Sequence, residues 1–261
     1  MTARERFAVR STSVSAQSTF HPTTTRSIRG QFHDRAEKGG EGEADRDRSA
    51  IEQAAVSDDM FDPRRHAPAT RRNREAILAV LQQALPAEGL VLEIASGTGE
   101  HAAFLAPALP NGLRWQPSEV EPAAMASIDA HAATAGSSRI APAMLLDASS
   151  PDWPLPRADA VFAANLVHIA PFEVAVVLFA GARRILVRGS PLVLYGPFKR
   201  NGAPTAASNA AFDRQLRAQN PAWGVRCLDT ELGPLAAGAD LALDAVIPMP
   251  ANNLTVVWRR R

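Results

Sequence analysis

The chain has 261 residues, a formal net charge of +1 and a hydrophobic content of 46%. A charge so close to zero gives no general attraction to nucleic acid or to an acidic membrane, and no apolar run approaches the ~20 residues of a membrane-spanning helix. Cys227 is the only cysteine, which excludes an intrachain disulfide and a thiolate zinc cluster, so we expect a cytoplasmic globular protein without metal, membrane or nucleic-acid partners.

Residues 1–59 differ in composition from the rest of the chain. Clusters of Ser and Thr are followed by mixed charge, and no apolar face recurs, so we expect a disordered tail and a single folded domain over residues 60–261. The first thirty residues are rich in Arg and Ser with Glu5 as the one acid, which is the composition of an organelle transit peptide. We favour the alternative that translation starts at Met60, because the ordered pattern begins only after it.

From Thr70 onward, helix-like and strand-like segments alternate. Apolar residues at helical spacing predict a helix that ends before Pro86, and further helices are expected over 102–109, 122–135 and 172–187. Strands are predicted over 90–95, 113–117, 140–146, 158–164 and 191–195. This alternation indicates a doubly wound, mostly parallel α/β sheet covered on both faces. The last two strands, 241–247 and 254–258, are joined by a link too short for a parallel return, so we expect a C-terminal antiparallel hairpin.

The segment from Val91 to His101 contains the main motif of the chain. An apolar strand leads into a turn with Gly97 and Gly99, and a helix follows. In a doubly wound sheet such a turn lies at the carboxyl edge, where ligands bind, and glycine lets the backbone approach a ligand closely. Gly-x-Gly-x-x-Ala alone is a weak signal, because a purely structural turn can also need two glycines.

Three acids come at the ends of three successive predicted strands. Glu93 ends a strand that should be buried, so its carboxylate needs a partner. Glu119 lies where an acid can accept both hydroxyls of a ribose, and Asp147 can accept from the exocyclic amine of adenine. A nicotinamide dinucleotide is the rival ligand, but Glu93 would repel its pyrophosphate and would favour the sulfonium and ammonium of S-adenosylmethionine. We therefore expect S-adenosyl-L-methionine as the cofactor.

The sequence resembles the small stand-alone methyltransferase-like proteins that are catalogued as a domain of unknown function. The matching segments cover residues 70–259 and are Arg72-Asn73, Glu93 to Ala102, Trp115 to Ser118, Tyr195 to Phe198, Asn220-Pro221 with Trp223-Gly224, and Met249 to Asn253. The resemblance implies a class I (Rossmann-like) methyltransferase fold and S-adenosylmethionine as cofactor, with no particular substrate. It also places Ala95 and Ser96 in the cofactor loop, and it favours a lid formed by Arg72 and Asn73 over a solvated helix charge.

Further candidates lie at the ends of the fourth and fifth strands. His168 is either a general base, because the pKa of histidine lies near neutrality, or a residue that binds backbone groups. Asn165 is expected to position backbone or cofactor, and His101 either packs over the cofactor or simply begins a helix. Tyr195, the only tyrosine, either lines the acceptor pocket or lies at its rim.

Together these observations predict an S-adenosylmethionine-dependent methyltransferase with a small-molecule substrate. Two alternatives stay open: a non-catalytic module that binds S-adenosylmethionine or S-adenosylhomocysteine, and a nicotinamide-dependent oxidoreductase. Asn252 and Asn253 are expected to form the last turn, because Asn tolerates positive φ, and a role on the substrate side is the weaker alternative. The chain lacks the Asn/Asp-Pro-Pro-Tyr/Phe set that often marks methylation of planar nitrogens. The run Arg259 to Arg261 is more typical of a solvated tail than of a nucleic-acid surface.

Overall fold

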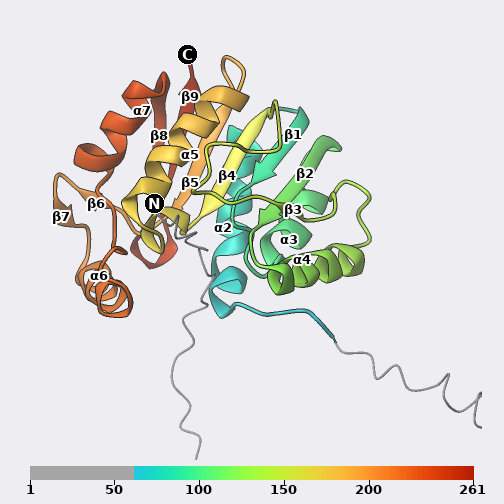
Figure 1. Ribbon diagram of the computed structural model, residues 1–261, viewed down its shortest axis with the longest axis horizontal. Coiled ribbons are helices and arrows are strands. Elements are labelled where there is room, and N and C mark those ends of the chain that lie inside the picture. Colours follow the sequence, from blue (N-terminus) through green and yellow to red (C-terminus); the bar gives the residue numbers. More distant parts are fainter. Residues whose placement is uncertain (1–61) are drawn as a thin grey trace, which may run out of the picture. The chain divides into compact units, whose positions relative to one another are not determined.

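The computed structural model describes residues 62–261, and the tail predicted over residues 1–59 lies outside this range. A seven-stranded sheet has the strand order β3-β2-β1-β4-β5-β9-β8 (Figure 1). Its strands are β1 (Glu88–Glu93), β2 (Gly112–Glu119), β3 (Met144–Leu145), β4 (Ala160–Ala164), β5 (Pro191–Gly196), β8 (Leu241–Met249) and β9 (Asn253–Arg260). Strands β1 to β5 are parallel, whereas β9 is antiparallel to both β5 and β8. The predicted parallel sheet with a terminal antiparallel hairpin is therefore confirmed.

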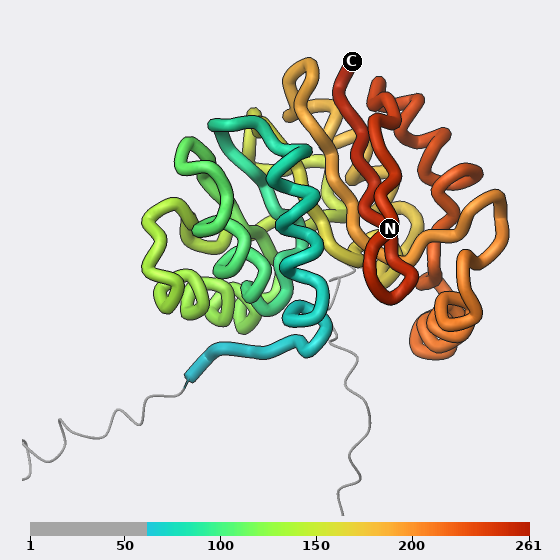
Figure 2. Tube along the Cα trace, turned by 180° about the vertical axis from the view of Figure 1, so that it is seen from behind, coloured from blue at the N-terminus to red at the C-terminus, as the bar shows by residue number. Residues whose placement is uncertain are grey.

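Helices cover both faces of the sheet (Figures 1 and 2). On one face lie α2 (Pro68–Ala84), α3 (Glu100–Ala108) and α4 (Pro122–Ala135), and on the other lie α5 (Phe172–Ile185) and α7 (Gly233–Gly238). Each face has its own apolar core: Ile77 and Leu105 pack against Val91 on the first, and Leu178 packs with Trp258 on the second. None of the helices within residues 62–261 is long and apolar enough to cross a membrane.

Local sequence signals explain most of the element boundaries. Pro122 occupies the first turn of α4, where its missing N–H costs nothing, and Gly136 ends the helix at φ 61°. Helix α2 begins at Pro68, ahead of the apolar repeat that predicted it. Strand β3 is shorter than predicted, and Ile140 contributes only a single bridge to Trp115. The side chain of Leu145 is 62% exposed at this sheet edge, so the apolar run there does not mark a buried strand.

One part of the domain was not predicted. Between β5 and β8 lie β6 (Lys199–Arg200), β7 (Ala203–Pro204), α6 (Ala207–Gln219) and the π-helix η2 (Leu228–Leu232). Two short 3-10 turns, η1 (Leu166–His168) and η3 (Pro250–Asn252), follow β4 and β8. Helix α6 is joined to η3, because the side chain of Asn209 donates to the carbonyl of Asn252 over 2.8 Å. These segments therefore gather beside the carboxyl end of β5.

Candidate cofactor and acceptor site

The glycine turn after β1 requires glycine at a defined point. The backbone takes positive φ at Ala95 (56°), Gly97 (62°) and Gly99 (88°), which is strained for alanine and easy for glycine. A Cβ added to Gly99 would lie 2.5 Å from the Cα of Ile128, so a side chain there would collide with the backbone of α4. The turn is thus packed against the middle of α4, close to the carboxyl ends of β1 and β2.

Glu119 at the end of β2 holds this turn in place. The Gly97 N–H donates to one carboxylate oxygen over 3.0 Å, and the Val120 N–H donates to the other over 2.8 Å. Glu119 is buried, and this burial raises its pKa above the ordinary value. The bond to Gly97 was not predicted, and it means that Glu119 shapes the glycine turn.

The buried carboxylate of Glu93 has a hydrogen-bond partner, as the sequence predicted. The indole N–H of Trp115 donates to Glu93 Oε2 over 2.9 Å. Burial nevertheless raises the pKa of Glu93 to about 7, against the opposing effect of the Trp115 bond. Ser118 and Ser96 both donate to the backbone carbonyl of Glu93, which ties the ends of β1 and β2 together.

Asp147 completes the row of acids. The backbone and hydroxyl of Ser149 donate to Asp147 Oδ1 over 2.8 and 2.6 Å, and Oδ2 has no hydrogen bond among residues 62–261. Asp147 lies two residues after the end of β3, and the Leu146 N–H between them donates to the carbonyl of Glu119 over 3.1 Å. The pairing of β1 with β2 and of β2 with β3 therefore brings all three acids to one edge of the sheet.

A row of polar side chains runs beside this edge on the α2 and α3 side. His101 Nε2 lies 2.9 Å from Asn73 Oδ1, and burial lowers the pKa of His101 to about 4, so the ring is neutral. Tyr195 lies next in the row: burial raises its pKa, and hydrogen bonds with Asn73 and Asn253 act in the opposite direction. Asn73, His101 and Tyr195, predicted separately, thus form one connected group, whereas Arg72 is exposed on α2.

His168 lies on the opposite side of β5 with no exposed surface. Its Nδ1 accepts from the Arg226 N–H over 3.2 Å, which places the ring proton on Nε2, and its carbonyl accepts from the Gly224 N–H. Burial, reinforced by the charge of Arg226, lowers the pKa of His168 to about 3. This geometry favours the interpretation in which His168 anchors the backbone over the one in which it is a general base.

The remaining candidates occupy backbone positions of special geometry. Asn165 has φ 61° where β4 enters η1, and its N–H donates to the carbonyl of Tyr195. In the last turn, positive φ occurs at Ala251 and Asn252, whereas Asn253 is already the first residue of β9. The predicted turn role therefore applies to Asn252 and was wrong for Asn253, whose side chain bonds to Tyr195 and to the Pro250 carbonyl.

Packing around His168 yields a prediction about stability. A Cβ added to Gly196 would lie 2.5 Å from His168 Nε2, and the buried ring has no room to retreat. We expect Gly196→Ala to lower the free energy of unfolding by about 1–3 kcal/mol, the usual range for overpacking. Urea unfolding measures this loss, with Gly238→Ala as the matched control because nothing lies within 4 Å of a Cβ there. Equal stability of the two variants would contradict the prediction.

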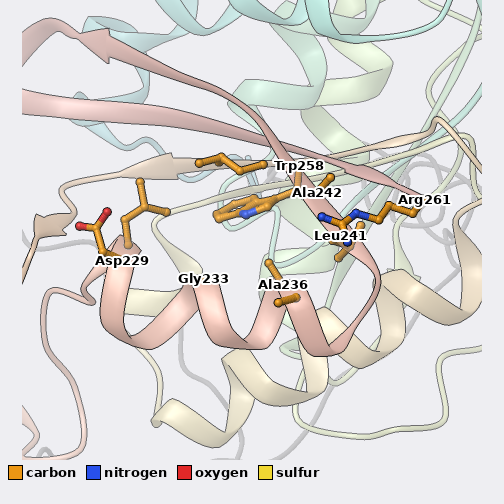
Figure 3. Close-up of a pocket in the computed structure, with 10 residues that line it drawn as sticks. Asp229, Gly233, Ala236, Leu241, Ala242, Trp258 and Arg261 are labelled. Atoms are coloured by element: carbon orange, nitrogen blue, oxygen red, sulfur yellow. The ribbon is translucent and has the colours of Figure 1, made fainter.

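Two further features were not predicted: a contact at the glycine turn and a groove far from the three acids. Glu100 and Ser127, at the glycine turn, bind the segment that precedes α2, and the sequence carries no local signal for this contact. A groove of about 350 Å³ lies between α7 and the start of β8, with Trp258 and Arg261 in its lining (Figure 3). Leu241 pairs with Arg260, so this groove is at the opposite edge of the sheet and is separate from the row of acids.

Comparisons with known proteins identify the family and the fold of the chain. A family model described as "Protein of unknown function (DUF938)" matches residues 64–260. Among solved structures, the chain is similar to CalO1, a methyltransferase in calicheamicin biosynthesis in its SAH-bound form, with 20% identity and a TM-score of 0.58 over 71% of this chain and 54% of that one. The chain thus spans about half the length of that protein.

Two further solved structures have the same architecture. Mitomycin 7-O-methyltransferase MmcR matches with 18% identity and a TM-score of 0.63 over 84% of this chain and 59% of that one. An O-methyltransferase family 2 protein from Planctomyces limnophilus, in complex with apigenin, matches with 18% identity and a TM-score of 0.60 over 82% of this chain and 69% of that one. Similarity at this level shows that the chain has the class I methyltransferase fold.

Proposed function

The chain belongs to the DUF938 family, and we propose that it is an S-adenosylmethionine-dependent methyltransferase that acts on a small molecule. One observation carries the proposal: three carboxylates, Glu93, Glu119 and Asp147, lie at or just beyond the ends of three adjacent parallel strands beside a glycine turn. The turn is bound directly to one of them, because Gly97 donates to Glu119. Ligands of doubly wound sheets bind at this edge.

The carboxylate oxygens of Asp147 and Glu119 can accept the hydrogen bonds that S-adenosylmethionine donates. Asp147 Oδ2 has no hydrogen bond among the described residues and suits a donor such as the adenine amine. Each oxygen of Glu119 accepts one backbone N–H, and a carboxylate oxygen has a further lone pair for a ribose hydroxyl. When bound, S-adenosylmethionine supplies an electrophilic methyl group on a sulfonium, and the buried acid Glu93 favours positive charge at this place.

On the side of the methyl acceptor, Tyr195 and its neighbours orient the acceptor and do not remove a proton from it. The raised pKa of Tyr195 keeps its phenol protonated at neutral pH, so its O–H can donate a hydrogen bond to the methyl acceptor. Asn73 and Asn253 hold the phenol in position from α2 and β9. Methyl transfer is an in-line displacement, and orientation of the two reactants contributes much of the acceleration in such reactions. We therefore assign Tyr195 to positioning of the acceptor.

Calorimetric titration of the full chain tests the proposal. We expect micromolar binding of S-adenosylmethionine and S-adenosylhomocysteine, and no binding of NADH. Binding of NADH alone would favour the oxidoreductase instead. Incubation with S-adenosylmethionine and a library of small acceptors then separates an enzyme, which releases S-adenosylhomocysteine, from a module that only binds it.

Asp147 provides a sharper test of the adenine contact. S-inosylhomocysteine carries a carbonyl where adenine carries its amine, so it cannot donate to the carboxylate from that exocyclic position. A hydrogen bond to a charged group contributes about 1.5–3 kcal/mol, so we expect the wild type to bind the adenosyl compound at least about tenfold more tightly. Asp147→Ala should bind the two compounds equally. If Asp147→Ala retained the preference, adenine would be recognised elsewhere.

A further inference from the structure

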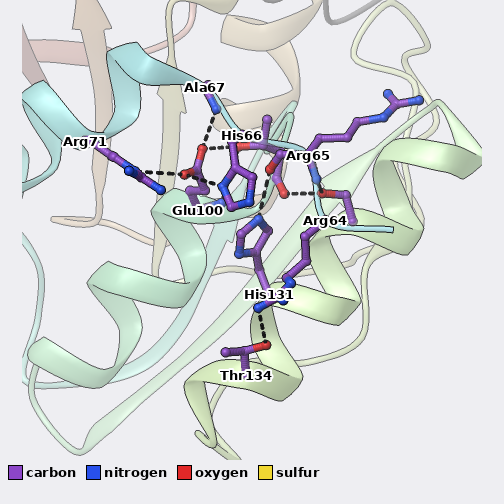
Figure 4. Close-up of polar contacts among 10 residues, drawn as sticks. Arg64, Arg65, His66, Ala67, Arg71, Glu100, His131 and Thr134 are labelled. Carbon is purple, nitrogen blue, oxygen red and sulfur yellow. Dashed lines mark hydrogen bonds and ion pairs between the residues drawn. The ribbon is translucent and has the colours of Figure 1, made fainter. Parts of the chain in front are cut away.

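The residues that precede α2 lie across the glycine turn and are bound to it on both sides. We call residues 63–67 the strap. Figure 4 shows the strap passing over the beginning of α3, where it meets Glu100, and along α4, where it meets His131 and Thr134. The strap is held both by its backbone, at Arg65 and Ala67, and by its side chains, which include an ion pair between Arg65 and Glu121.

The first connection runs through Ser127 of α4. The Arg65 N–H donates to Ser127 Oγ over 2.8 Å, and Ser127 donates in turn to the carbonyl of Thr98 over 2.8 Å. Thr98 lies between the two glycines of the turn, and Ser127 is completely buried. A single hydroxyl thus links the backbone of the strap to the backbone of the turn.

The second connection runs through Glu100 of α3. Its Oε2 accepts from the Ala67 N–H over 2.6 Å and from the Thr98 hydroxyl over 3.2 Å, and its Oε1 lies 3.2 Å from His66 Nδ1. Burial raises the pKa of Glu100, but the bonds from Ala67, His66 and Thr98 outweigh this effect and hold the pKa below its ordinary value. The carboxylate is therefore charged at neutral pH and available to both partners.

The strap also meets the residues that follow Glu119. The guanidinium of Arg65 makes a bidentate ion pair with Glu121, with both distances 3.0 Å. Charge from Glu119 acts on Arg65 as well, in the direction that raises the pKa of the guanidinium. His131 Nε2 lies 2.9 Å from the Arg65 carbonyl and bounds the strap on its other side. The strap is therefore attached to the segment that follows β2 as well as to α3 and α4, beside the proposed cofactor site.

We propose that Ser127 and Glu100 are positioning residues that couple docking of the strap to binding of the adenosyl cofactor. This inference rests on the proposed function. Thr98 is bound to the strap through its carbonyl by Ser127 and through its hydroxyl by Glu100, so the turn and the strap order one another. Coupling between two events is reciprocal: a cofactor that stabilises the turn must stabilise the docked strap by the same factor.

Hydrogen exchange of the full chain, with and without S-adenosylhomocysteine, measures this coupling. The amides of Arg65 and Ala67 are the bonded ones, so the peptide that contains residues 63–67 should exchange more slowly when the ligand is present. We expect Ser127→Ala and Glu100→Gln each to weaken ligand binding about fivefold or more and to reduce this slowing. Slow exchange of α5 in each variant establishes that the fold is intact.

Ser138→Ala is the matched control. Ser138 is exposed just beyond α4, and within residues 62–261 its side chain has no hydrogen bond to the strap or to the glycine turn. Its ligand affinity and the slowing of strap exchange should equal those of the wild type. If the wild type binds the ligand while strap exchange is unchanged, or if both variants bind as the wild type does, this inference alone is overturned. A wild type that binds neither adenosyl compound overturns the proposed function and this inference together.

Discussion

Glu93→Gln is expected to make the ligand-free protein more stable at pH 8 while weakening its binding of S-adenosylmethionine. Burial raises the pKa of Glu93 from 4.5 to about 7, so the folded state favours the protonated acid. This contribution to stability is fully present below the unfolded pKa and is lost as pH rises through 7. At about 1.4 kcal/mol per pKa unit, the whole shift corresponds to roughly 3 kcal/mol, of which roughly 2 kcal/mol is lost between pH 5.5 and pH 8.

Urea unfolding at pH 5.5 and pH 8 measures this effect. Glutamine is neutral at both values and keeps an oxygen that accepts from the indole N–H of Trp115, so the variant should lack this part of the pH dependence. Glu75→Gln, at an exposed position of α2, is the matched control and should follow the wild type. Parallel pH profiles of wild type and Glu93→Gln would contradict the prediction.

The same shift predicts how pH affects the ligand. A positively charged ligand favours the carboxylate of Glu93, so binding should release a proton near pH 7. Affinity for S-adenosylmethionine should therefore increase from pH 6 to pH 7.5 in the wild type and much less in Glu93→Gln. Calorimetry in two buffers of different ionisation enthalpy counts the protons released. No release from the wild type would place the charged end of the cofactor away from Glu93.

The main sheet and its helices could be predicted because their sequence signals are local. Strand β4 is an apolar run that is buried along almost its whole length, and α5 buries one face at helical spacing. Pro122 and Gly136 mark the two ends of α4 by their backbone geometry. Each of these signals acts within one element, so no knowledge of the partner is needed.

The segment between β5 and β8 could not be predicted for the opposite reason. Helix α6 buries only Asn209 and Leu216, so its sequence shows no apolar repeat. It is held instead by bonds such as that from Asn209 to the carbonyl of Asn252, 43 positions away. Arg226 likewise donates to the carbonyls of Val167, Ala170 and Ala222 from within the core. Contacts to distant backbone groups leave no period in the sequence.

In the candidate site, too, residues with a local sequence signal could be predicted and residues held by distant contacts could not. The three acids could be located because each lies at or just beyond the end of a strand, and parallel strands end at one edge of a sheet. The bond between Asn73 and His101 depends on how α2 and α3 are turned against each other, which the spacing of the two residues does not determine. The role of Glu100 was missed because its partner is the backbone of the strap, which any residue could supply.

Glu119→Ala is expected to have the largest effect on ligand binding. Two hydrogen bonds from ribose hydroxyls to a charged acceptor would be lost, at about 1.5–3 kcal/mol each, so the affinity for S-adenosylhomocysteine should fall at least about tenfold. The variant also leaves the N–H groups of Gly97 and Val120 without their acceptors, which should lower the free energy of unfolding by about 1–3 kcal/mol each if they stay buried.

A deoxy analogue of the ligand separates these two consequences. S-adenosylhomocysteine without its 2′-hydroxyl should bind the wild type more weakly, whereas Glu119→Ala should bind both forms equally, since the group that reads the hydroxyl is gone. If the variant were weak only because the turn had loosened, it would still prefer the natural ligand. An unchanged dissociation constant in Glu119→Ala would remove Glu119 from the site. A loss that depends on the 2′-hydroxyl would instead assign this carboxylate to both tasks, shaping the glycine turn through Gly97 and binding the ribose.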